Sequence, residues 1–149
     1  FFSLKSLTSY KKSINYIQKS KKNLSETQQQ DYVWLFTVAQ TYVNNNNPKQ
    51  ALIYLQHIID QYEFTALNAI ILQSKALRSL NRQKEALNII NKTITHINNY
   101  DLILLEKVFI CSELNLKQEC INAIKSYLLY ASKDPKWELL TIMNQLTSS

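Results

Sequence analysis

The sequence predicts an all-α fold built from antiparallel helix pairs that follow one another along the chain. One short phrase, an Asn followed five residues later by a small residue and then an aliphatic one, occurs three times, starting at Asn46, Asn81 and Asn115. The phrases begin 35 and then 34 residues apart, a spacing that holds two helices and a turn and is typical of helical repeats. Gly is absent and Pro occurs twice, which disfavours tight hairpins and Gly-rich phosphate loops.

The length and the hydropathy of the chain limit the class of protein. A chain of 149 residues can bury a core without disulfide or metal cross-links, and we expect a single domain over 1–149. No apolar run is long enough for a transmembrane span or a signal-peptide core, which favours a soluble, cytoplasmic segment. Because the sequence begins with Phe1 and not with Met, we expect a fragment or a processed product of a longer chain.

The net charge of +6 is concentrated near the amino terminus. Residues 1–22 hold six Lys and no acid, whereas residues 23–149 hold eleven bases and eleven acids. Within residues 1–22, apolar residues recur at helical spacing, at Leu4, Leu7, Tyr10, Ile14 and Ile17. The pattern predicts a basic amphipathic helix or half-repeat over 1–24. Its lysines are interpreted first as a solvated face; an acidic partner, a nucleic-acid backbone and an anionic membrane surface are the alternatives left open.

The first predicted pair occupies 32–65. Ser25 with Gln28 matches a capping box, which predicts the start of the first helix. Asn47 followed by Pro48 predicts the start of the second helix, because Asn is a favoured N-cap and Pro fits the first helical position. The run of four Asn residues, 44–47, is predicted to end the first helix.

Two further pairs and a terminal helix complete the prediction, over 67–100, 101–134 and 135–149. Thr65 is predicted to cap the first helix of the second pair, and Asp101 is predicted to open the third pair. A stack of this kind needs a lid over its last apolar face, and the terminal helix is expected to supply it. The apolar positions on which this prediction rests are Trp137, Leu140 and Leu146.

The asparagines of the repeated phrase have a physical explanation. The turn between paired helices must reverse the chain within a few residues, and a left-handed residue after the first helix achieves this reversal. Asn is the commonest residue other than Gly that tolerates this conformation. We therefore expect left-handed backbone at Asn46, Asn81 and Asn115.

The small residues of the phrase should mark close helix crossings. Ala51, Ala86 and Cys120 each follow the Asn by five residues, where the second helix should pass nearest to the first. Cys120 and Cys111 are the two cysteines of the chain, and we interpret them as reduced thiols buried in the seam of the third pair. A disulfide between them is the alternative left open.

The pattern resembles the tetratricopeptide repeat (TPR), whose first helix carries a small residue and an aromatic one and whose second helix carries Ala and then a large apolar residue. The resemblance covers about 32–134. Its matching positions are Ala39, Tyr42, Ala51 and Leu55 in the first pair, Ser74, Leu77, Ala86 and Ile90 in the second, and Val108, Cys111, Cys120 and Ile124 in the third. It implies a right-handed superhelical stack of the pairs, a TPR-like α-solenoid with a C-terminal capping helix.

The resemblance also implies a concave groove lined by the first helices of the pairs. Carried onto this chain, the lining residues are Val33, Phe36, Gln40, Val43, Asn68, Ile71, Leu72, Lys75, Arg78, Leu102, Leu105, Glu106 and Phe109. The apolar stripe that helix packing is expected not to need consists of Phe36, Ile71, Leu72, Leu105 and Phe109. A contiguous exposed apolar surface favours a binding site. The alternative left open is that the N-terminal or the C-terminal helix folds back and fills the groove.

No pattern in the sequence favours catalysis, so we expect neither an enzyme nor a cofactor or metal site. The two histidines, His57 and His96, lie on different second helices and are interpreted as surface or interhelical residues. The TPR form that clamps an acidic chain terminus with several bases fits poorly, because Lys75 and Arg78 are the only bases of the implied groove.

The sequence therefore predicts a non-catalytic protein-protein interaction module that binds an apolar or amphipathic segment of a partner, as an inserted helix or as an extended peptide. The specific form that the resemblance implies is a bacterial secretion chaperone. The alternative is a TPR regulatory domain of a larger protein, for example a transcriptional regulator. A homodimer is also left open.

Overall fold

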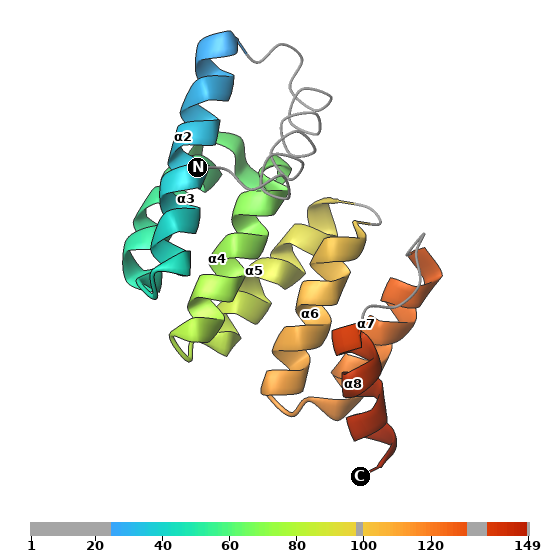
Figure 1. The fold of residues 1–149 in the computed structure, drawn as a ribbon. Helices are drawn as coiled ribbons and strands as arrows, with labels where there is room; N and C mark the ends of the chain where they lie inside the picture. Colours follow the sequence, from blue (N-terminus) through green and yellow to red (C-terminus); the bar gives the residue numbers. More distant parts are fainter. Residues whose placement is uncertain (1–24, 98–99, 131–136, 149) are drawn as a thin grey trace. The chain divides into compact units, whose positions relative to one another are not determined.

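The computed structural model describes residues 25–97, 100–130 and 137–148, which contain seven α-helices, one short 3-10 helix and no strand (Figure 1). The all-α prediction is confirmed, and successive helices pack as antiparallel pairs. The predicted N-terminal helix over 1–24 lies outside the described residues. None of the described helices is long and apolar enough to cross a membrane.

The chain divides into two compact units, Phe1–Asn81 and Arg82–Ser149. The first contains α2 (Glu26–Asn44), α3 (Pro48–Tyr62), the 3-10 helix η1 (Glu63–Thr65) and α4 (Leu67–Ser79). The second contains α5 (Gln83–His96), α6 (Asp101–Glu113), α7 (Lys117–Tyr130) and α8 (Trp137–Thr147). The boundary thus falls at the turn inside the second predicted pair, and a single domain over 1–149 stays a prediction.

The starts of α2 and α3 agree with the sequence prediction. Ser25 Oγ accepts a hydrogen bond from Gln28 N (3.2 Å), and Gln28 Oε1 accepts one from Ser25 N (2.9 Å). This reciprocal capping box satisfies two amides that the helix itself leaves without partners. Pro48 opens α3 directly after Asn47, although the Asn47 side chain makes no capping hydrogen bond.

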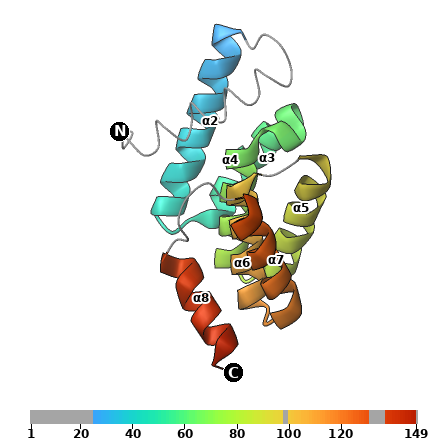
Figure 2. The same cartoon turned by 90° about the vertical axis from the view of Figure 1, so that its right-hand side faces the viewer.

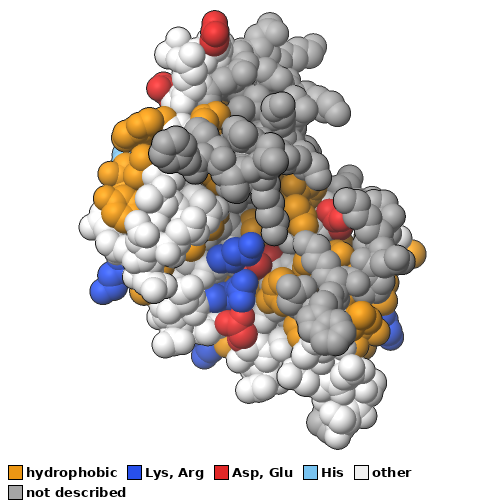
Figure 3. Space-filling view, in the orientation of Figure 1, with side chains coloured by type: hydrophobic (Ala, Val, Ile, Leu, Met, Phe, Trp, Pro, Cys, Tyr) orange, Lys and Arg blue, Asp and Glu red, His pale blue; other side chains and the backbone are white. Residues whose placement is uncertain are grey.

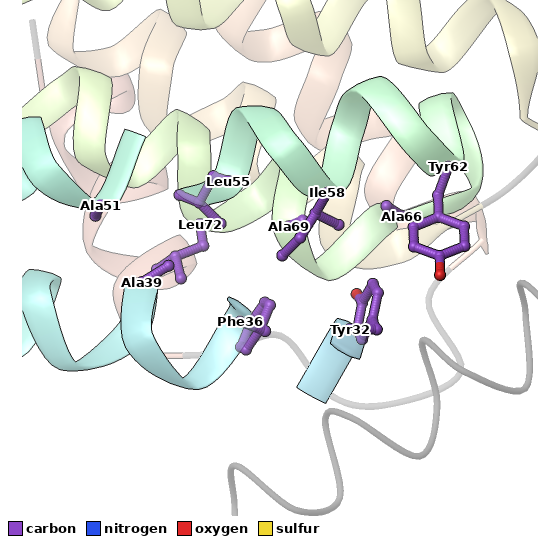
Figure 4. Close-up of a cluster of buried hydrophobic side chains, with 10 residues drawn as sticks. All are labelled: Tyr32, Phe36, Ala39, Ala51, Leu55, Ile58, Tyr62, Ala66, Ala69 and Leu72. Carbon is purple, nitrogen blue, oxygen red and sulfur yellow. The ribbon is translucent and has the colours of Figure 1, made fainter. Parts of the chain in front are cut away.

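The core of the first unit lies between α2, α3 and α4 (Figure 4). Tyr32, Phe36 and Ala39 extend from α2 toward the buried side chains of the other two helices. Tyr32 stacks with Phe36 (centroids 6.2 Å apart) and meets Tyr62 edge-on (5.7 Å), both of which are favoured aromatic arrangements. Ala39 and Ala51 are fully buried, and their small size lets α2 and α3 approach closely.

In the second unit, α6 and α7 form an antiparallel pair, and both α5 and α8 pack against α6. Figure 2 shows α5 at the right of this unit and α8 at its lower left. The apolar cluster of this unit joins residues of α6 and α7 with Leu139 of α8, which is fully buried. This finding corrects the predicted apolar side of the terminal helix, because Leu140 is 41% exposed. One residue along a helix turns the side-chain direction by about 100°, so the packed side of α8 is centred on Leu139.

All three predicted left-handed asparagines are confirmed. The φ angle is 58° at Asn46, 59° at Asn81 and 57° at Asn115. Beyond Asn115, the amide of Leu116 donates to Cys111 O (3.0 Å), the long-range bond of a Schellman motif. The corresponding bond, from the second residue after the helix, also closes the turn at Asn46 (2.8 Å). Asn therefore adopts at these turns the left-handed conformation that Gly adopts at many helix ends.

The small residues of the repeated phrase are buried, as predicted. Ala51 and Ala86 are fully buried, and Cys120 is 1% exposed. Val108, which stands on α6 where the third pair would be expected to carry a smaller residue, is fully buried as well. The third pair therefore accommodates a larger side chain in its seam.

The link from α3 to α4 differs from the prediction. Thr65 belongs to η1, and its Oγ1 donates to Tyr62 O (2.5 Å) instead of capping α4. Ala66 is the N-cap residue of α4. Glu63 has a φ of 53°, so this link also contains a left-handed residue, which no Asn or Gly signals. A Thr hydroxyl can either cap a helix or donate to a nearby backbone carbonyl. The hydroxyl of Thr65 donates to the carbonyl of Tyr62.

Replacement of Asn81 by Ala should lower the free energy of unfolding by about 1 kcal/mol, because left-handed backbone is costly for residues with an ordinary Cβ. Asn81→Gly should be tolerated, since Gly adopts this φ without that cost. Asn88→Ala, on the exposed side of α5, is the control and should change stability by less than about 0.5 kcal/mol. Urea denaturation followed by circular dichroism measures all three, and equal losses for the two Ala variants would contradict the assignment.

Candidate partner-binding face

The α2 part of the predicted groove is partly buried. Val33, Phe36, Gln40 and Val43 are spaced by three or four residues and therefore lie on one side of α2. Phe36 is 4% exposed and belongs to the core, whereas Val33 and Val43 are partly exposed and pack against the core. Gln40 is also partly exposed, and its Nε2 donates to Asn44 Oδ1 (3.1 Å). Two valines and one amide of the predicted groove are thus partly exposed on α2.

The α4 part has a similar arrangement. Asn68 and Leu72 are buried, with 7% and 5% of their surfaces exposed. Ile71 and Arg78 are partly exposed, and Lys75 is exposed. Ile71 is therefore the apolar residue of this set that a partner can reach, and the two bases follow it one and two turns along the helix.

α2 and α4 present these residues in the same register. Gln40 and Lys75 are 35 residues apart, as are Val43 and Arg78, and this is the spacing of the first two repeated phrases. The two helices contact each other within the first unit. We name the exposed and partly exposed members of the set the first-helix face: Val33, Gln40, Val43, Ile71, Lys75 and Arg78.

The burial of Phe36, Leu72 and Leu105 corrects one expectation. The sequence predicts that helix packing does not need these residues, but Phe36 and Leu72 belong to the core of the first unit and Leu105 to that of the second. Each of their helices packs against more than one neighbour, so its buried stripe is wider than a two-helix seam requires. Of the predicted apolar stripe, Ile71 and Phe109 remain partly exposed.

The second unit contributes α6 to the predicted groove. Leu105 and Glu106 are buried, at 4% and 2% exposed, while Leu102 and Phe109 are partly exposed. Leu105 and Phe109 pack in the same apolar cluster as residues of α8. Two of the four predicted groove residues on α6 are therefore buried and two are partly exposed, and a continuous groove over α2, α4 and α6 stays a prediction.

The two cysteines are free and buried in the seam between α6 and α7, as predicted. Cys120 Sγ donates a weak hydrogen bond to Val108 O (3.7 Å). Burial raises the pKa of the Cys111 thiol to about 11, and the Glu119 carboxylate acts in the same direction. Burial also raises the pKa of Cys120. Because the thiolate is the reactive form, both side chains act here as small apolar residues.

The histidines lie on the surface. His57 on α3 and His96 on α5 are both exposed, and His96 Nδ1 lies 2.8 Å from Lys92 O in the last turn of its helix. Within the described ranges of the chain, no group of three or more His, Cys, Asp or Glu side chains could hold a metal ion.

The first unit also carries an exposed aromatic residue, Trp34, to which the sequence analysis gave no role. Trp34 is 60% exposed and meets Tyr54 edge-on (centroids 6.3 Å apart), and Tyr54 stacks on Tyr42 (5.7 Å). In Figure 3, hydrophobic side chains gather on the left of the view, over α2 and α3. The signal in the sequence is the separation of Trp34 and Tyr42 by eight residues, about two helical turns, which places both on one side of α2.

Comparison of the chain with protein-family models, with curated protein sequences and with solved structures finds no match. The class of protein is therefore defined by the structure itself, as an all-helical protein of stacked antiparallel helix pairs. The resemblance to the TPR rests on the spacing and residue types of the repeated phrase.

Phe36→Ala should lower the free energy of unfolding by about 3–5 kcal/mol, because it removes a buried aromatic side chain and leaves a cavity in the core. Ile53→Ala on α3 removes an apolar side chain that is 54% exposed and should cost less than about 1 kcal/mol. Chemical denaturation compares the two variants. If Phe36→Ala cost no more than Ile53→Ala, Phe36 would be a surface residue, as the sequence analysis expected.

Alkaline pH should destabilise the protein in part through Cys111. Its pKa is raised in the folded state from the ordinary 9.0 to about 11, so the folded protein holds this proton more tightly than the unfolded chain. The resulting stabilisation is complete below pH 9 and is lost as the pH rises through 11. The free energy of unfolding should fall over this window, and it should fall less in Cys111→Ala.

The buried tyrosines Tyr62 and Tyr127 also have raised pKa values, but their contribution is common to the parent and the variant. The difference between the two pH profiles therefore isolates the thiol. Denaturation curves at pH 8, 9, 10 and 11 measure it, and parallel profiles would show that Cys111 does not titrate in this way.

Proposed function

We propose that this protein is a non-catalytic interaction module that binds an apolar or amphipathic segment of a protein partner on its first-helix face. The observation that supports the proposal is the composition of this face. Val33, Val43 and Ile71 remain partly exposed after packing, and an amide and two bases lie beside them in the same register. Apolar patches rimmed by polar residues are typical of protein interaction sites.

We further propose that the helix pairs continue as a TPR-like, right-handed stack. The support is the regular spacing of the left-handed residues Asn46, Asn81 and Asn115, together with the buried small residue that follows each of them. In such a stack the first helices line one concave surface, so that α6 would extend the surface offered by α2 and α4.

We expect the first-helix face to bind a partner segment that has apolar side chains in its middle and acidic or amide side chains at one end. Ile71 supplies the apolar contact on α4, and Lys75 and Arg78 lie beyond it. Charges on such a rim steer association and fix the orientation of the partner more than they add affinity. Shielding of apolar segments of an exported protein, as bacterial secretion chaperones do, is one form of this function and rests on the family resemblance alone.

The proposal is tested by selecting peptides from a displayed library of amphipathic and extended sequences and measuring their affinity by fluorescence anisotropy. Ile71→Glu should weaken binding at least about 10-fold, because it places a carboxylate in an apolar contact. Ile53→Glu makes the same change on the exposed side of α3 and should leave the affinity within about twofold.

Circular dichroism has to show the same helix content in both variants before the affinities are compared. If both Glu variants bind as the parent does, or if both lose binding equally, the selected peptides bind elsewhere and the first-helix face is not the site.

A further inference from the structure

We propose that α8 occupies the α6 part of the partner-binding face in the free protein, and that an amphipathic helix of the partner with the same apolar spacing displaces it. The inference rests on the proposed function and makes it more specific, because it names a helix, and not an extended peptide, as the ligand. It follows from the pattern of α8, from where α8 packs, and from what it covers.

The side chains of α8 divide into a packed side and an exposed side. Leu139 is fully buried, and Ile142, Met143 and Leu146 pack against the same apolar cluster. Their spacing of three, four and seven residues from Leu139 puts them on one side of the helix. The exposed side consists of Leu140, Thr141, Asn144 and Gln145. This is the pattern of a helix that inserts into a groove.

The position of α8 differs from that of a helix that simply continues a stack. In the first unit, α4 follows the pair α2–α3 and packs mainly against the second helix, α3, with a lighter contact to α2. In the second unit, α8 follows the pair α6–α7; it makes a light contact with the first helix, α6, about as extensive as that of α4 with α2, and its apolar side chains pack in a cluster that α6 and α7 both form. α8 therefore lies on the helix that carries the predicted groove residues.

Burial on α6 agrees with this placement. Ile71 on α4 and Leu105 on α6 are 34 residues apart and occupy the same register position, as do Lys75 and Phe109. Ile71 is partly exposed and Lys75 is exposed, whereas Leu105 is 4% exposed and Phe109 packs in the cluster that α8 joins. At the register position of Ile71, α6 thus carries a buried residue, Leu105, whereas Phe109 at the position of Lys75 stays partly exposed.

An intramolecular helix of this kind would act as a competitor. If α8 is docked in about 99% of molecules, a ligand that needs the same face binds about 100-fold more weakly than it would to the open face. A partner helix that makes more contacts than the packed side chains Leu139, Ile142, Met143 and Leu146 make could still displace α8. Binding would then couple the release of α8 to the recognition of the partner.

The test uses the full chain and a probe that is independent of any partner: a fluorescein-labelled peptide of residues 137–147. The double variant Ile142→Asp with Leu146→Asp should undock α8 and bind the peptide at least about 10-fold more tightly than the parent, measured by anisotropy. The control, Leu140→Asp with Gln145→Asp, changes the exposed side of α8 and should bind the peptide as weakly as the parent. The probe is the sequence of α8 itself and not a partner peptide. A negative result in this experiment would therefore contradict the docking of α8 without contradicting the proposed function.

The proposal is overturned if the undocked variant, with its helix content retained, binds the peptide no better than the control. It is also overturned if the variant forms dimers that exchange α8 between copies. Should the variant unfold, native-state hydrogen exchange of the parent decides the question: the amides of α8 should exchange through an opening that leaves α6 and α7 protected. Exchange of α8 only with global unfolding would make it a fixed part of the core.

Discussion

The left-handed turn between paired helices is the constraint on which the described packing depends. At Asn46 and Asn115 a single positive φ and the long-range amide bond that closes the turn set the direction of the next helix. Once this direction is set, the side chain five residues later faces the preceding helix at close range. Ala51 and Cys120 are small because the turn places them there. In the α2–α3 and α6–α7 pairs, one left-handed backbone angle thus fixes which residue of the second helix lies in the seam.

Much of this local architecture could be predicted because it depends on residues close in the sequence. The Ser25 capping box, the start of α3 at Pro48 and the three left-handed asparagines each involve groups within about six residues of one another. Such interactions leave a clear pattern of residue types and spacings. The class of fold follows from them, since three evenly spaced turns between amphipathic helices leave few other ways to bury the apolar sides.

The candidate site was predicted less completely, because exposure depends on helices that are distant in the sequence. The positions on α2 and α4 share one side of each helix, as expected, but Phe36 and Leu72 are buried because each helix has more than one neighbour. The choice of Leu139 over Leu140 as the packed residue of α8 likewise depends on where α8 meets α6. Glu63 could not be predicted for a different reason: its backbone is left-handed, but Glu is not a residue type that indicates this conformation.

The packing order has a consequence for how the chain folds. The described contacts within each unit join helices that are consecutive or nearly so, such as α2 with α3, α3 with α4, and α6 with α7. Contacts of this kind give a low contact order, so that little loop-closure entropy is lost before they form. Helical proteins with such topology fold in about microseconds to milliseconds. The apolar sides of single helices would then be exposed only briefly, which limits aggregation while the chain folds.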